Sequence, residues 1–161
     1  MHKIKVKLGD IDKAIAELEK YEKQVQRNIE DFLKKLLESG VDIAKAQLVS
    51  LNAIESGEVF NSLSYTLYKE GKNGVIFADN KHACRVEFGD GIRGAEAPHP
   101  NIPVSWAYDS KGHGEDGWYY FDEKQGRIRY TQGMPSRPFM YNTARELEKK
   151  AVAIAREVFS R

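Results

Sequence analysis

Apolar residues recur at steps of three and four from residue 11 to residue 36, the longest periodic run in the chain. This spacing is typical of one face of a long α-helix, and charges of both signs fill the other face. Glu22 is the one polar residue at a stripe position. The stripe consists of Ile11, Ile15, Leu18, Val25, Ile29, Phe32 and Leu36.

The pattern resumes after Ser39-Gly40 and continues to Leu51. Glycine inside a helix costs about 1 kcal/mol, so the sequence predicts two helices, or one long helix with a break, over residues 10–52. We interpret the stripe as ordinary core more readily than as a coiled-coil seam. A stripe of this length nevertheless invites a partner helix.

Alternation replaces this spacing in several shorter runs. Residues 2–8 alternate Ile4, Val6 and Leu8 with three lysines, which predicts an N-terminal strand. Asp10 then has the chemistry of a helix N-cap.

Further strands are predicted in the middle of the chain. Residues 62–68 and 74–78 flank a glycine-containing turn and form a hairpin, residues 83–88 form a third strand, and residues 118–121 and 127–130 form a second hairpin. Residues 139–159 have helical spacing, and Thr143 with Glu146 has the spacing of a capping box. This order predicts an α+β fold, with an antiparallel sheet of four to five strands and the C-terminal helix packed on the sheet.

Residues 89–117 show no clear periodicity and are rich in glycine and proline. A stretch of this length is unusual in a compact domain, so we expect a functional or mobile loop. The 161-residue chain fits one domain, residues 1–161, that carries this irregular insertion.

Composition excludes several classes of protein. A net charge of +1 argues against a dedicated nucleic-acid binder. No apolar run approaches the roughly 20 residues that cross a bilayer, and the N-terminus has no apolar block of the secretory type. Cys84 is the only cysteine, so no disulfide forms within the chain.

The candidate metal ligands are few: His82, Cys84, His99 and His113, with Glu87 and Asp90 nearby. On a strand, His82 and Cys84 would share one face, with Glu87 nearby, but the second close pair of a zinc site is missing. We therefore interpret these residues as a buried thiol and surface histidines, and expect neither cofactor nor metal. The alternative is a small intracellular metal-assisted hydrolase that uses His82, Cys84 and Glu87. A further alternative is a DNA-associated adaptor that uses the lysines of residues 2–8.

Three stretches are more specific when they are read together: IESGEVFNSL at 54–63, HACRVEFGDG at 82–91, and GMPSRPFMYNTARELEK at 133–149. Their order and spacing, after a long helix, resemble the minor tail component family of long-tailed phages, the tail-completion or head–tail joining proteins. The resemblance covers roughly residues 10–155. The residues that match the family pattern are Ser56, Gly57, Ser62, Leu63, Val86, Glu87, Phe88, Gly89, Arg137, Pro138 and Phe139.

The resemblance implies a structural virion protein of a phage or prophage, not an enzyme. Such a protein completes the tail, or joins it to the head connector, by assembling into a homo-oligomeric ring. Six copies is the expected number, and DNA could pass through the ring. The implied partners are connector and tail proteins, with no membrane, and the implied location is the virion after synthesis in the bacterial cytoplasm.

The sequence also suggests which residues contact other subunits and where the chain bends before the last helix. The candidate assembly contacts are the first helix stripe, Ile11, Ile15, Leu18 and Val25, and the loop at residues 89–117. Pro138 and Phe139 predict a corner that fixes where the last helix docks and buries an aromatic ring at the bend.

Overall fold

The computed structural model describes residues 8–69, 71–109, 112, 117–123 and 125–160. The chain folds around one long helix, α1 (Leu8–Ser50), which is followed by a short helix α2 (Glu58–Ser62). The hairpin β1 (Leu63–Tyr68) and β2 (Asn73–Ala78) comes next, then two short helices, α3 (Ala83–Phe88) and α4 (Gly91–Glu96). A second hairpin, β3 (Trp118–Asp122) and β4 (Arg127–Thr131), precedes the last helix α5 (Phe139–Phe159).

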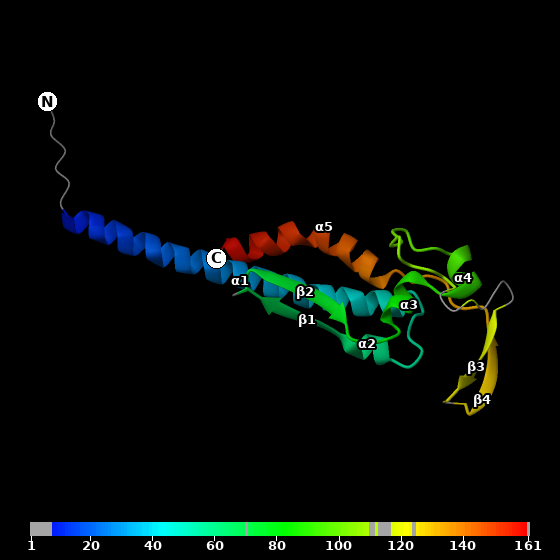
Figure 1. Ribbon diagram of the computed structural model, residues 1–161. Helices are drawn as coiled ribbons and strands as arrows, with labels where there is room; N and C mark the ends of the chain where they lie inside the picture. Colours follow the sequence, from blue (N-terminus) through cyan, green and yellow to red (C-terminus); the bar gives the residue numbers. More distant parts are fainter. Residues whose placement is uncertain (1–7, 70, 110–111, 113–116, 124, 161) are drawn as a thin grey trace.

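The expected α+β class is confirmed, but the predicted layer arrangement is wrong. The strands form two separate antiparallel pairs, β1–β2 and β3–β4, and not a single sheet of four to five strands. Helix α5 packs along α1 and not on a sheet, and the β1–β2 hairpin also packs against α1 (Figure 1). The long helix therefore takes the place of a central sheet.

Helix α1 runs without interruption through Gly40, so the predicted break or helix pair is wrong. A Cβ at Gly40 would meet Ile76 of β2, and it would lie 2.8 Å from Leu147 Cδ1 of α5. The glycine is the place where a strand and a second helix both approach α1 closely. Tertiary packing thus explains a residue that helix propensity disfavours.

The start of α1 also differs from the prediction. Residues 1–7, which carry most of the expected N-terminal strand, lie outside the described residues, and Leu8 already belongs to the helix. Asp10 lies in the first turn of α1 and not at the N-cap. At the other end, Asn52 has a φ of 50° and the Ala53 N–H donates to the Leu48 carbonyl at 2.9 Å, which completes the helix end.

The first hairpin is confirmed. Leu63, Tyr65 and Leu67 face α1 and are more buried than the residues between them, as the alternation predicts. The second hairpin is also confirmed, with Trp118 paired to Thr131 and Asp122 paired to Arg127.

The predicted strand at residues 83–88 is wrong, because this segment forms α3. Its buried residues are Ala83, Val86 and Glu87, which are spaced as on a helix face and not as on a strand. Asn80 begins the turn, since its side chain accepts the His82 N–H at 2.8 Å and its carbonyl accepts the Ala83 N–H.

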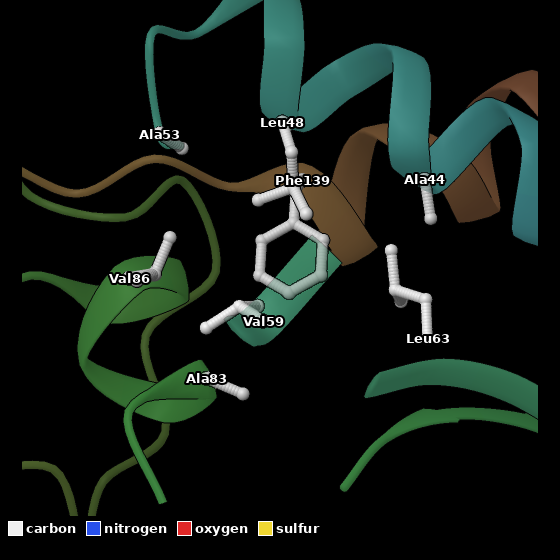
Figure 2. Close-up of a cluster of buried hydrophobic side chains, with 8 residues drawn as sticks. All are labelled: Ala44, Leu48, Ala53, Val59, Leu63, Ala83, Val86 and Phe139. Carbon is white, nitrogen blue, oxygen red and sulfur yellow. The ribbon is translucent and has the colours of Figure 1, made fainter. Parts of the chain in front are cut away.

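The main core lies where the end of α1, α2, the start of β1, α3 and the start of α5 converge (Figure 2). Phe139 lies at its centre with 0% of its surface exposed. The predicted aromatic at the bend before the last helix is therefore confirmed. The capping box at Thr143 is not formed, because α5 begins at Phe139 and Thr143 Oγ1 donates to the Phe139 carbonyl at 2.6 Å inside the helix.

Candidate functional site

The three motif segments meet in the fold. The segment at 54–63 supplies Val59 and Leu63 to the core, the segment at 82–91 supplies Val86, and the segment at 133–149 supplies Phe139 (Figure 2). Gly57, at the N-cap of α2, has a φ of 77°, a conformation that glycine adopts without a Cβ clash. Ser62 closes the same short helix, since its Oγ donates to the Val59 carbonyl at 2.9 Å.

The carboxylate of Glu87 caps the first turn of α5. Its Oε2 accepts the Met140 N–H at 2.8 Å and its Oε1 accepts the Tyr141 N–H at 2.9 Å. These donors have no acceptor within the helix, and a negative charge is favourable at a helix N-terminus. Glu87 is buried, so it replaces water as the acceptor for both groups.

Backbone bonds hold the same two segments together. The Arg137 N–H donates to the Val86 carbonyl at 2.9 Å, and Ser136 Oγ donates to the Glu87 carbonyl at 2.8 Å. Gly89 has a φ of 80°, and a Cβ there would lie 2.8 Å from the Ser136 backbone nitrogen. The matching residues of the second and third motifs therefore form one junction.

His99 completes this junction, although the sequence interpretation placed it among the surface histidines. Its Nδ1 accepts the Asn101 N–H at 2.9 Å, so the proton lies on Nε2, which donates to Glu87 Oε1 at 3.0 Å. The buried ring packs edge-on against Phe88 and Tyr141, with centroids 4.8 and 5.4 Å away. The only sequence signal was its position between Pro98 and Pro100, which gives no clue to its burial.

The histidine and thiol assignments are corrected by these contacts. His99 is buried, whereas Cys84 is exposed, the reverse of the interpretation from the sequence. Because residues 83–88 are helical, the strand geometry that would have brought His82 and Cys84 to one face does not apply. Among the residues that the structure describes, no group of three His, Cys, Asp or Glu side chains is placed to hold a metal ion.

The junction is therefore built to position a helix. Each Glu87 oxygen accepts a backbone N–H at the start of α5, and Oε1 also accepts the His99 proton. Through His99, the segment that follows α4 is tied to the same point. Phe88 adds a contact to the Trp106 ring at 5.1 Å.

The expected loop at residues 89–117 contains regular structure. It contains α4, and Asp90 and Met134 exchange two backbone hydrogen bonds of 2.9 Å. Residues 110–111 and 113–116 of the loop lie outside the described residues. Val104 projects its side chain fully into solvent.

The N-terminal part of α1 extends beyond every other element of the fold (Figure 1). The side chains of residues 9–24 are all exposed. Of the predicted contacts, Ile11, Ile15 and Leu18 are 47, 49 and 68% exposed, and Val25 is half-buried. Further along the same stripe, Phe32 lies against Phe159 of α5 with ring centroids 6.4 Å apart.

A second exposed apolar face lies on the β3–β4 hairpin, and it was not predicted. The register pairs Tyr119 with Tyr130 and Phe121 with Ile128, so these four side chains share one side of the ribbon. They are between 49 and 73% exposed. The alternation could have revealed this face, but the residues were assigned to a larger sheet that would have covered them.

The other side of this hairpin carries Trp118 and Tyr120 together with polar and charged side chains. Asp122 Oδ2 accepts a hydrogen bond from Arg129 Nη1 at 3.2 Å, and this bond raises the pKa of the Arg129 guanidinium. Arg127 Nε donates to Gln125 at 2.8 Å. Arg93, Arg129 and Gln132 line a cavity of about 260 Å³ beside the hairpin.

Comparison with known proteins adds no relative: no family model, curated protein or solved structure matches the chain. No helix among the described residues combines the length and the apolar character needed to cross a membrane.

Proposed function

We propose that the protein is a structural component of a phage or prophage virion that completes the tail or joins it to the head connector. It acts by assembling with copies of itself into a ring, with six as the expected number, and by contacting connector and tail proteins. DNA passes through the ring, and the protein enters the virion after synthesis in the host cytoplasm.

The observation that supports this proposal best is the projecting half of α1. Its exposed stripe of Ile11, Ile15 and Leu18 extends away from the body of the fold (Figure 1). Covering apolar surface is favourable by roughly 25 cal/mol per Å², and contiguous exposed apolar patches are a mark of interaction sites. A rigid helix that presents such a stripe is suited to assembly.

The junction around Glu87 supports the same proposal. The residues that carry the resemblance form a corner that fixes α5 on α1, and they include Val86, Glu87 and Phe139. A bend that fixes the position of α5 on α1 gives the protein a defined shape, which a subunit of an assembly needs in order to fit its neighbours. The hydrolase alternative required His82, Cys84 and Glu87 to face one site, whereas Cys84 is exposed and the buried Glu87 carboxylate accepts backbone N–H groups of α5.

The proposal is tested in the phage or prophage whose genome carries the gene. Deleting the gene should leave filled heads and tails that do not join, or tails of abnormal length, in electron micrographs of the lysate. Supplying the protein from a plasmid should restore joined particles, and the protein should be found in purified particles. Wild-type particle yield without the gene would contradict the proposal.

The hydrolase alternative is tested separately on purified protein. Stoichiometric zinc by elemental analysis, with hydrolysis that is lost on chelation, would support the alternative. A Cys84→Ala variant should then lose zinc, whereas a virion part should keep its role in particle joining with that substitution.

A further inference from the structure

A small polar cavity lies between α4 and the β3–β4 hairpin, which are neighbours at the end of the molecule opposite the free end of α1 (Figure 1). Its volume is about 260 Å³, below the roughly 300–1,000 Å³ of pockets that hold a whole drug-sized molecule. None of the Asp and Glu residues that the structure describes lines this cavity. The lining residues are Arg93 of α4 and, from the hairpin and the position after it, Tyr120, Arg129, Tyr130, Thr131 and Gln132.

Backbone contacts hold the two walls of the cavity together. The Arg93 N–H donates to the Gln132 carbonyl at 3.2 Å. Gly91, at the start of α4, lies against the Trp118 ring of β3, since a Cβ at Gly91 would be 2.8 Å from Trp118 Cζ3. The backbone of both walls is therefore fixed before a ligand binds, which lowers the entropy that binding costs.

The hairpin wall offers hydrogen-bond donors. Tyr120 and Arg129 are paired across the strands and Thr131 lies two positions further, so the three side chains share one side of the ribbon. Arg129 Nη1 donates to Asp122 at 3.2 Å, which uses one of the five N–H groups of the guanidinium. Thr131 Oγ1 accepts the Gly133 N–H at 3.0 Å, so its own hydroxyl proton is left to donate.

The α4 wall adds a second cation. The exposed Arg93 forms no ion pair within the described part of the chain. Two acids act on Arg129, which are Asp122 through the hydrogen bond and Glu55 at longer range, and neither lines the cavity. The cavity surface therefore carries two guanidinium groups together with uncharged donors.

From this donor set we propose that the cavity binds a phosphate group. Guanidinium groups bind phosphate oxygens through paired N–H donors. Two guanidinium groups that come from separate walls suit a tetrahedral group, whose oxygens point in several directions, better than a planar carboxylate. The ring of Tyr120, which is 39% exposed, offers a flat surface to the molecule that carries the phosphate. Free phosphate, a mononucleotide and a DNA strand all supply this group, and the site is independent of the proposed virion role.

The overall charge of the protein separates this site from a general attraction of anions. The chain has a net charge of only +1, so long-range attraction of anions is weak. An anion that binds must therefore be held by the local arrangement of donors. Binding should saturate at one phosphate per chain.

Isothermal titration calorimetry of the full chain at constant ionic strength tests the proposal. The ligands are inorganic phosphate, deoxyadenosine monophosphate and a short single-stranded DNA without terminal phosphates. Inorganic phosphate should bind saturably, and acetate should bind at least about tenfold more weakly. Tighter binding of the nucleotide or of the DNA strand would identify the natural carrier of the phosphate.

Arginine substitutions locate the binding. Arg93→Gln and Arg129→Gln should each weaken phosphate binding by roughly tenfold to a hundredfold, because each removes hydrogen bonds from a charged donor. Arg127→Gln is the matched control, since Arg127 lies on the same side of the same ribbon, donates to Gln125 and does not line the cavity. This variant should stay within about threefold of the wild type. Circular dichroism checks that each variant is folded, and Arg93→Gln decides if the loss of the Asp122 contact unfolds Arg129→Gln.

Three results would overturn the proposal. One is the absence of saturable binding for all three phosphate ligands, and another is acetate that binds as tightly as phosphate. The third is an Arg127→Gln variant that loses as much affinity as Arg93→Gln, because binding would then reflect the general charge of the region. None of these results affects particle joining, which the gene deletion tests by itself.

Discussion

The Glu87 carboxylate and the Tyr141 backbone N–H are joined by a hydrogen bond of 2.9 Å across 54 positions of sequence. A residue of the short helix α3 thus supplies the cap that the start of α5 lacks. Pro138, at the N-cap position, makes no side-chain capping bond. The local sequence cannot satisfy the first turn of α5, and a distant carboxylate does.

This cap predicts a large effect of Glu87→Ala. The substitution leaves two backbone N–H groups of α5 and the His99 Nε2 proton without their acceptor. We expect the free energy of unfolding to fall by about 3 kcal/mol, measured by urea denaturation. Glu96→Ala, at an exposed position in α4, is the control and should change it by less than about 0.5 kcal/mol. Equal effects of the two substitutions would refute the capping role.

Gly40→Ala tests whether packing or propensity decides at this position. Helix propensity alone predicts stabilisation by about 1 kcal/mol. The added Cβ would meet Ile76 and Leu147, so we expect instead a loss of about 1–3 kcal/mol in the free energy of unfolding. Gly9→Ala in the same helix has nothing within 4 Å of the new Cβ and should be neutral or slightly stabilising. Thermal denaturation of both variants distinguishes the two explanations.

Phe139→Ala should strongly destabilise the protein. Phe139 is fully buried in the cluster shared by α1, α2, β1, α3 and α5, and removing its ring leaves a cavity there. We expect a loss of about 3–5 kcal/mol in chemical denaturation. Phe121→Ala, on the exposed hairpin face, should leave monomer stability nearly unchanged at low protein concentration. The Phe139 role would be contradicted by an effect as small as that of Phe121→Ala.

Cys84 should react readily in the folded protein, because its side chain is exposed. A thiol reagent such as Ellman's reagent should modify one thiol per chain at nearly the same rate with and without denaturant. Cys84→Ala should leave both the unfolding midpoint and self-association unchanged. Slow modification that needs denaturant would show a buried thiol, as the sequence interpretation first held.

Several elements followed from the sequence because their signal is local. The β1–β2 and β3–β4 hairpins have alternating residues on both sides of a turn, and α5 has an uninterrupted helical spacing that matches its bounds. The exposure of Ile11, Ile15 and Leu18 agrees with their choice as candidate contacts. Their role in assembly remains a prediction.

The helical structure of residues 83–88 and the burial of His99 could not be predicted from local sequence patterns. Residues 83–88 are too short for periodicity to separate a strand from a helix, and the buried positions that distinguish the two depend on α5 and the main core. The burial of His99 likewise depends on Glu87, 12 positions earlier. Nothing in the local sequence around His99 or Glu87 indicates that the two side chains form a hydrogen bond.

The sequence by itself determined that α1 and α5 are helical and that two hairpins pair, because backbone preference and apolar spacing act over a few residues. Only the tertiary structure decided that Gly40 lies inside one continuous helix, that Glu87 caps α5, and that two small ribbons replace one sheet. The physical reason is that these outcomes depend on space and on unsatisfied donors supplied by distant segments. The chain brings those segments together only when α5 closes on α1.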